Sequence, residues 1–137
     1  MTTEEYLERR KSKDWNFFAI VETDSFKNVK KIHPLKQKLV KAIVDAAKKD
    51  SYIRRIIIFG SSTRYDCDIT SDLDICIEWT EPCRDKDGVY YPFTLPIRKV
   101  ISKVTKGRAD VINYELLEDT YLTDAVREGV EVYGNDV

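Results

Sequence analysis

The sequence has few of the residues that bind zinc or form disulfides. It contains one histidine, His33, and three cysteines, Cys67, Cys76 and Cys83, none of them in a CxxC spacing. A structural zinc site takes about four such ligands, and a disulfide framework needs paired cysteines. Neither is expected here. The cysteines should pack as small apolar side chains, with Cys76 the best candidate for burial.

Long apolar runs and a strong net charge are also missing. No run approaches the roughly 18 residues of a membrane span, and the start, MTTEEYLERRKSK, is too charged for a signal peptide. The 23 basic and 24 acidic residues leave a formal charge of -1, which gives the whole molecule little attraction for a polyanion. We therefore expect a cytoplasmic protein that binds neither membranes nor bulk nucleic acid.

What remains is an ordinary globular composition. The 137 residues are 42% hydrophobic and 34% charged, which suits one folded domain. Residues with helical apolar spacing or suitable ends predict helices over 2–10, 33–49, 95–107 and 120–129. Runs rich in β-branched residues or with alternating polarity predict strands over 54–60, 73–79 and 109–115. The order indicates one α+β domain, a small mixed sheet flanked by helices, while residues 14–31 could be helix or strand.

The predicted helix over 33–49 has an apolar face and lies in a stretch of sequence rich in Lys and Arg. The face consists of Leu35, Leu39, Val40, Ile43, Val44 and Ala47. From Lys27 to Arg55 the sequence has ten Lys and Arg residues and only Asp45 and Asp50 as acids. A solvated helix face explains this best, and an anionic ligand or partner is the alternative. His33, beside Pro34, should mark the entry of the helix.

Two aspartates stand at the start of the strand over 73–79. Side chains alternate along a strand, so Asp72 and Asp74 leave one face while Leu73 and Ile75 enter the core. Two carboxylates so close repel each other, an arrangement that a divalent cation would stabilise. Magnesium is the natural candidate, because it combines a few carboxylate oxygens with water and substrate phosphates. A solvated strand edge is the alternative.

The strand over 54–60 ends in the string GSSTR. Gly60 allows a sharp turn, and Ser61 follows with a hydroxyl and a backbone N–H that can hold phosphate oxygens. Arg64 could add hydrogen bonds to the same phosphates or form a surface ion pair, and both readings stay open. Asp66 and Asp68 are expected to form turns rather than bind metal.

Other metal and phosphate motifs do not match this stretch. In an EF-hand loop that starts at Asp66, the glycine position holds Ser71 and the glutamate position holds Ile77. No GK[ST] follows Gly60, so the turn is not a P-loop. A third carboxylate, Asp110, lies in the strand over 109–115, and with Asp72 and Asp74 it could hold two magnesium ions if the strands are neighbours.

GSSTRYDCDITSDLDI, preceded by an apolar strand and followed by Asp110, resembles the pattern of the DNA polymerase β-like nucleotidyltransferase superfamily. GSSTR and SDLDI are most similar to minimal nucleotidyltransferases, the MNT proteins of prokaryotes. The similarity covers roughly residues 32–133. The expected nucleotidyltransferase domain spans residues 32–137, with residues 1–31 as an N-terminal helical and aromatic extension. Thr63 and Tyr65 replace a usual alanine and a usual glycine of the motif.

The resemblance implies a fold, a reaction and a site. The fold would be that of polymerase β-like nucleotidyltransferases, and the reaction a Mg²⁺-dependent transfer of NMP, with AMP expected, from a nucleoside triphosphate to a hydroxyl. Asp72, Asp74 and Asp110 would be the catalytic magnesium ligands. Gly60, Ser61 and Arg64 would bind the nucleotide.

The resemblance leaves the acceptor open. The preferred one is a tyrosine of an HEPN-type toxin, which would make the protein an antitoxin. A small-molecule acceptor of the aminoglycoside type is one alternative. The other is a binding module that masks its partner with little or no catalysis. Transfer to a nucleic-acid end is disfavoured by the size and neutral charge of the chain.

Overall fold

The computed structural model describes residues 2–3, 16–80, 83–85, 88–90, 95–114 and 121–134. Most of the helix predicted over 2–10 falls outside these ranges. Within them, none of the helices has the length and apolar character that a bilayer crossing requires.

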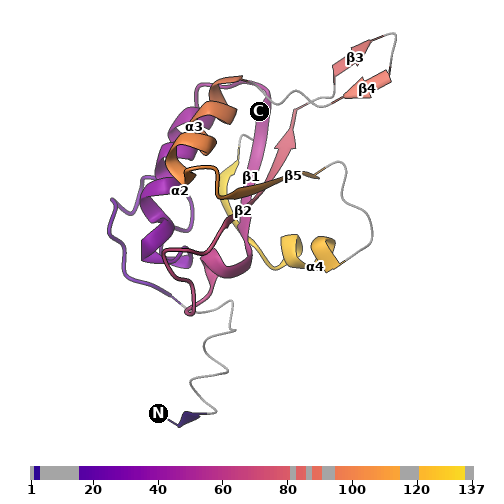
Figure 1. Ribbon diagram of the computed structural model, residues 1–137. Coiled ribbons are helices and arrows are strands. Elements are labelled where there is room, and N and C mark those ends of the chain that lie inside the picture. Colours follow the sequence, from indigo (N-terminus) through magenta and orange to yellow (C-terminus); the bar gives the residue numbers. More distant parts are fainter. Residues whose placement is uncertain are drawn as a thin grey trace.

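A four-stranded mixed sheet forms the centre of the molecule, in the order β5-β2-β1-β6 (Figure 1). Strands β1 (Ile53–Phe59) and β2 (Leu73–Trp79) are antiparallel, and β6 (Val130–Gly134) pairs with the other side of β1. Strand β5 (Ala109–Asn113) runs parallel to β2. The predicted α+β class is confirmed, and β6 is an additional strand that the sequence analysis did not assign.

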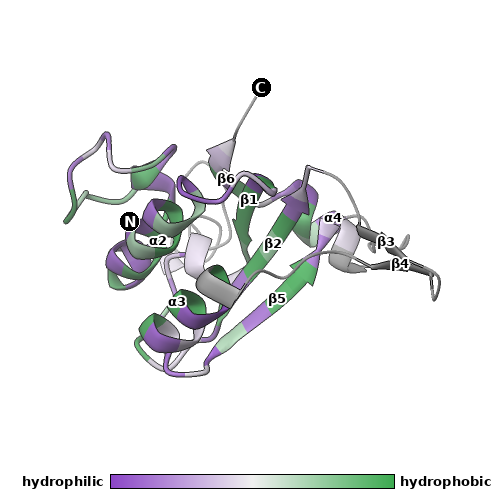
Figure 2. Ribbon diagram, turned by 90° about the horizontal axis from the view of Figure 1, so that it is seen from above, coloured by the Kyte–Doolittle hydropathy of each residue, from purple (hydrophilic) through white to green (hydrophobic). Residues whose placement is uncertain are grey.

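Helices cover the two faces of the sheet unequally. The longer helices, α2 (Pro34–Ala47) and α3 (Leu95–Thr105), lie together on one face, and α4 (Tyr121–Arg127) lies on the other (Figure 2). A separate pair of antiparallel strands, β3 (Cys83–Asp85) and β4 (Gly88–Tyr90), precedes α3 in the sequence. The crossover through α3 is what allows β2 and β5 to be parallel.

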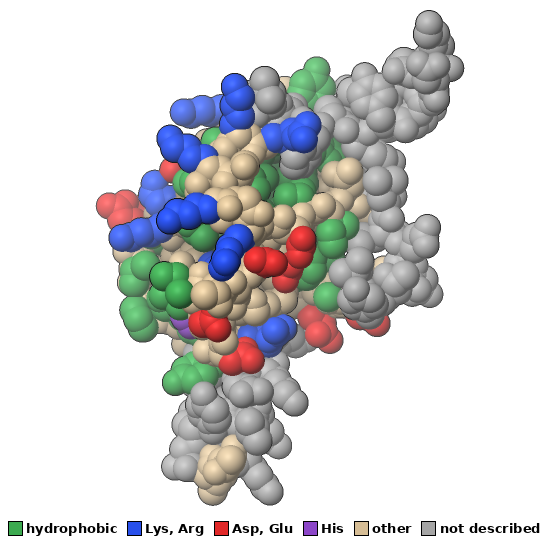
Figure 3. Space-filling model, in the orientation of Figure 1, with side chains coloured by type: hydrophobic (Ala, Val, Ile, Leu, Met, Phe, Trp, Pro, Cys, Tyr) green, Lys and Arg blue, Asp and Glu red, His purple; other side chains and the backbone are tan. Residues whose placement is uncertain are grey.

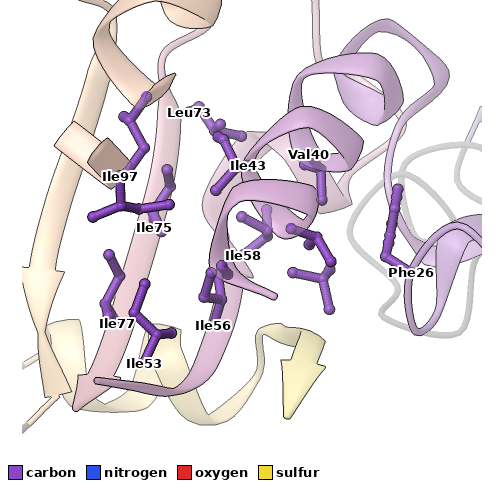
Figure 4. Close-up of a cluster of buried hydrophobic side chains, with 14 of the residues drawn as sticks. Phe26, Val40, Ile43, Ile53, Ile56, Ile58, Leu73, Ile75, Ile77 and Ile97 are labelled. Carbon is purple, nitrogen blue, oxygen red and sulfur yellow. The ribbon is translucent and has the colours of Figure 1, made fainter. Parts of the chain in front are cut away.

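The main hydrophobic core lies between the sheet and helices α2 and α3. Ile56, Ile58, Leu73, Ile75 and Ile77 project from β1 and β2 toward these helices, and each is at most 1% exposed (Figure 4). A smaller cluster on the opposite face packs Ile57, Phe59 and Cys76 against Val126 of α4. The alternation predicted for β2 is confirmed, since Leu73 and Ile75 are in the core, and the predicted burial of Cys76 is confirmed as well.

The first turns of α2 differ from the predicted amphipathic pattern. Leu35 was expected to face the core but is 48% exposed, whereas Lys36 and Gln37 are buried. Gln37 is accommodated because its amide bonds three backbone groups, the N–H of Ile20 and the carbonyls of Phe18 and Ile32. These bonds join α2 to the preceding segment, so tertiary hydrogen bonding overrides hydrophobic periodicity at this position.

Residues 16–33, the described segment directly before α2, pack on the domain. They include the short 3₁₀ turn η1 (Val29–Lys31), and Phe26, Val29 and Ile32 enter the main core. His33 caps α2, because its Nδ1 accepts a hydrogen bond from the Leu35 N–H at 3.1 Å. The predicted role of His33 at the entry of the helix is confirmed.

Candidate active site

The turn after β1 brings the backbone against a carboxylate. Gly60 begins the 3₁₀ turn η2 (Gly60–Thr63) with φ +72, in the left-handed region that favours glycine. A Cβ atom at Gly60 would overlap an oxygen of the Asp74 carboxylate. The Thr63 hydroxyl donates to the Gly60 carbonyl at 2.9 Å and closes the turn. Only glycine therefore fits this position beside Asp74.

Strand pairing brings a second carboxylate to the same point. Asp74 is paired with Phe59 of β1 on one side and with Asp110 of β5 on the other. Because β2 and β5 are parallel and in register there, the two aspartate side chains leave the same face of the sheet, close enough for Asp110 to raise the pKa of Asp74. Asp110 thus lies beside Asp74 although 35 residues separate them in the sequence.

The environment of Asp74 makes its ionisation costly. The pKa of Asp74 is raised from 3.8 to about 6, first by burial and then by the charges of Asp110 and Asp72, against the opposing effect of the Arg64 charge. In the view of Figure 3, a few acidic side chains lie near the centre of the molecule, and Lys and Arg side chains gather over α2 and α3. A bound cation would relieve the repulsion between these carboxylates.

The three predicted metal ligands do not contribute equally. Asp74 is half-buried and in contact with Asp110, whereas Asp72 acts on Asp74 through its charge alone; Asp72 and Asp110 are both exposed. Across the described ranges, no three Asp, Glu, His or Cys side chains are already arranged to hold a metal. The contacting pair still fits magnesium, which takes one or two carboxylates and completes its octahedron with water and phosphate oxygens.

The serines of η2 occupy different environments. Ser61 is half-buried at the turn, and its carbonyl accepts the N–H of Arg64 at 3.0 Å. Ser62 is fully buried, and its carbonyl accepts the N–H of His33 at 2.8 Å. Of the two serines, Ser61 therefore has the more accessible hydroxyl, while the backbone of Ser62 connects the turn to the start of α2.

The loop between η2 and β2 is built by its own polar side chains. The Asp68 carboxylate accepts hydrogen bonds from the N–H and hydroxyl of Thr70 at 2.8 and 2.6 Å, which forms a turn. These bonds lower the pKa of Asp68. Arg64 forms an exposed ion pair with Asp66 at 3.4 Å. Asp66 and Asp68 therefore have structural partners, as expected, and Arg64 has the surface ion pair as well as its effect on Asp74.

Two cations hold the end of this loop directly before Asp72. Lys36 donates to the Ser71 carbonyl at 2.6 Å, and Arg108 donates to the Thr70 carbonyl at 3.2 Å. Lys36 was predicted to lie on a solvated helix face, which is wrong, because only 5% of this residue is exposed. The sequence could not predict that Lys36 binds this loop, because nothing in a basic helix distinguishes it from its neighbouring lysines. The contact depends on where the loop packs in the folded protein.

Replacing Lys36 is expected to loosen this loop. Lys36→Met should lower the free energy of unfolding by about 1–3 kcal/mol, because the Ser71 carbonyl would lose its partner in a buried place. Urea unfolding followed by circular dichroism measures the change. Lys38→Met, at an exposed position of the same helix, should change stability by less than about 0.5 kcal/mol. Equal effects of the two substitutions would contradict the assigned contact.

Comparison with known proteins identifies the family of the chain. The family model for polymerase β nucleotidyltransferases matches residues 41–137. The chain therefore belongs to this nucleotidyltransferase family. It is also similar to the 1.40 Å crystal structure of a presumed nucleotidyltransferase from Sulfolobus solfataricus, with 24% identity, a TM-score of 0.41, and coverage of 72% of this chain and 80% of the other. Among curated proteins no significant match was found.

Family membership settles the general class and leaves its finer divisions open. The protein is a nucleotidyltransferase, and the predicted polymerase β-like class is confirmed. The narrower assignment to the minimal nucleotidyltransferases remains a prediction, as does the division into an extension over 1–31 and a catalytic domain over 32–137.

Proposed function

We propose that the protein transfers a nucleoside monophosphate, with AMP expected, from a nucleoside triphosphate to a hydroxyl acceptor. The acceptor oxygen would form a bond to the α-phosphorus, the bond from that phosphorus to pyrophosphate would break, and the hydroxyl proton would leave. The observation that supports this proposal most is the in-register contact of Asp74 and Asp110 beside the Gly60 turn.

Each residue of the site has a proposed role. Asp74 and Asp110, with Asp72 adjoining them, would hold Mg²⁺, which would offset the negative charge of the nucleotide phosphates. Gly60 and Ser61 would contact the phosphates, because the turn presents backbone and hydroxyl groups next to the carboxylates. Arg64 would add positive charge there, since its charge already acts on Asp74. Asp110 could also accept the proton of the acceptor hydroxyl.

The proposed acceptor is a tyrosine of an HEPN-type toxin, which would make this protein an antitoxin. The test incubates the protein with Mg²⁺, each α-labelled nucleoside triphosphate in turn, and the product of the adjacent gene. Label from ATP is expected on a tyrosine of that product, and EDTA should abolish the labelling. Mass spectrometry would identify the modified side chain.

Other outcomes of this experiment would select the alternatives. Tight binding of the partner with no labelling under any nucleotide would support the non-catalytic binding module. Labelling of an aminoglycoside, with none on the partner, would support small-molecule transfer. Labelling that persists in EDTA would contradict the proposed dependence on magnesium.

A further inference from the structure

A pocket of about 570 Å³ lies on the α2 and α3 side of the molecule, on the opposite face of β2 from Asp74. Residues from α2, from the loop before β2 and from the end of α3 line it. Its apolar wall includes Leu35, Leu39, Ile69 and Val104. Leu35 is 48% exposed and Ile69 is 78% exposed, so apolar surface is available to a ligand at the pocket.

The charged residues that line this pocket all have the same sign. They are Lys36, Lys106 and Arg108, and no acidic side chain is among the described residues of the wall. The chain as a whole has a formal charge of -1, so this excess of three positive charges is a local feature. Three cations beside an apolar wall create a potential that attracts an anion.

Lys36 is the buried cation of the three. Its ammonium group can donate three hydrogen bonds, and among the described residues it has one acceptor, the Ser71 carbonyl at 2.6 Å. With 95% of the residue removed from solvent, an unneutralised ammonium is costly unless further partners are supplied. A ligand anion in the pocket would supply both charge and acceptors.

Lys106 reaches the pocket from an unusual backbone conformation. It follows α3 with φ 55, in the left-handed region, at a helix end where glycine or asparagine is usual. The turn is fixed on both sides, because the Thr105 hydroxyl donates to the Ile101 carbonyl at 2.6 Å and the Gly107 N–H to the Ser102 carbonyl at 3.0 Å. The position of Lys106 beside the pocket is therefore set by a rigid turn.

We infer that this pocket binds a small organic anion that combines an apolar body with a carboxylate or phosphate group. The apolar wall would bury the body, and Lys36, Lys106 and Arg108 would bind the charged group. A small molecule fits better than a protein segment, because ligand pockets span about 300–1,000 Å³. A stable protein interface buries about 800 Å² on each partner, much more than one such pocket offers.

The pocket is separate from the candidate nucleotide site. Successive residues of a strand point to opposite faces, so Leu73 lines the pocket while Asp74 faces Asp110 on the other side. Binding in the pocket therefore requires neither nucleotide nor metal. This separation allows the inference to be tested independently of transferase activity.

The test uses 8-anilinonaphthalene-1-sulfonate, an apolar dye with one anionic group, added to the folded protein without metal. Its fluorescence should rise to saturation with a stoichiometry of about one. Lys106→Glu should weaken binding about tenfold, because an attraction becomes a repulsion. Ile69→Asp should weaken it similarly. Octanoate and octyl phosphate should displace the dye, and whichever does so at lower concentration identifies the preferred group.

Matched controls distinguish this pocket from general dye binding. Lys38→Glu, on the same helix as Lys36 but outside the pocket, and Ile20→Asp, at another exposed isoleucine, should leave the affinity unchanged. Circular dichroism of each variant confirms that it is folded. Absence of saturable binding, equal effects of the controls, or displacement by octanol as strong as by octanoate would overturn the inference. Displacement by ATP would assign the pocket to the nucleotide site instead.

Discussion

Asp74→Asn is expected to reduce nucleotide transfer at least about a hundredfold, because it removes one of the two contacting carboxylates from the centre of the site. The assay is the labelling reaction with Mg²⁺, ATP and the adjacent gene's product. Asparagine has nearly the same shape as aspartate, so the substitution tests the charge of the group. Transfer at the wild-type rate by the variant would reject the proposed role of Asp74.

The same substitution is expected to stabilise the protein in metal-free buffer at neutral pH. The pKa of Asp74 is about 6 in the folded state and has its ordinary value of 3.8 when unfolded, so the folded state binds this proton more tightly. Protonated Asp74 therefore favours the folded state. This effect on the free energy of unfolding is complete below about pH 4 and is lost as the pH rises through about 6. Because the group is half exposed, solvent screening reduces the difference to about 1 kcal/mol.

Unfolding by urea at about pH 4 and about pH 7.5, in EDTA, measures this effect. Asp74→Asn should match the wild type at the lower pH and exceed it at the higher one. Asp68→Asn is the matched control, because hydrogen bonds lower the pKa of Asp68, so its substitution should not stabilise at neutral pH. Stabilisation by both variants, or by neither, would contradict the proposed electrostatics at Asp74.

Gly60→Ala is expected to abolish transfer and to destabilise the fold by about 2–3 kcal/mol. Alanine at φ +72 costs about 1–2 kcal/mol by its backbone conformation alone. Its Cβ would also overlap the Asp74 carboxylate, so either the turn or the carboxylate must move. The displacement would separate the phosphate-binding turn from the carboxylate pair, and the labelling reaction would report its effect.

Gly107→Ala is the control that separates the cost of a positive φ from the cost of the overlap with Asp74. Gly107 has a similar φ of +78, but a Cβ there would meet no atom within 4 Å. Gly107→Ala should therefore lower the free energy of unfolding only through the backbone conformation, and transfer should stay intact. Gly60→Ala should lose both stability and transfer. If the two variants lost equal stability and both retained transfer, the close packing of Gly60 on Asp74 would have no functional meaning.

Much of the architecture could be predicted because local patterns and tertiary packing agree. The β-branched run before Gly60 became β1, and the alternation around Asp74 became β2, with Leu73 and Ile75 in the core. The helices α2, α3 and α4 also form where periodicity and end signals placed them. Strand β6 was missed because five residues are too few for their alternation of apolar and polar side chains to distinguish a strand from a loop.

The predictions failed where long-range contacts outweigh local pattern. Leu35 has the helical spacing of a core residue, yet it is exposed, and the charged Lys36 next to it is buried. The reason is the loop before β2, whose Ser71 carbonyl receives the Lys36 ammonium. Gln37 is buried for a similar reason, since backbone groups of the preceding segment satisfy its amide. No periodicity in one helix contains information about these partners.

The sequence by itself determined the chemistry available to this protein. It placed Asp72 directly before β2 and Asp74 within that strand, and it put Gly60 where a positive φ is required, because these properties depend on neighbours along the chain. The tertiary structure alone decided that Asp110 meets Asp74, since that contact depends on the parallel register of β5 with β2. It also decided that Lys36 is buried while Asp72 stays exposed, because burial is set by which distant segments pack against a residue.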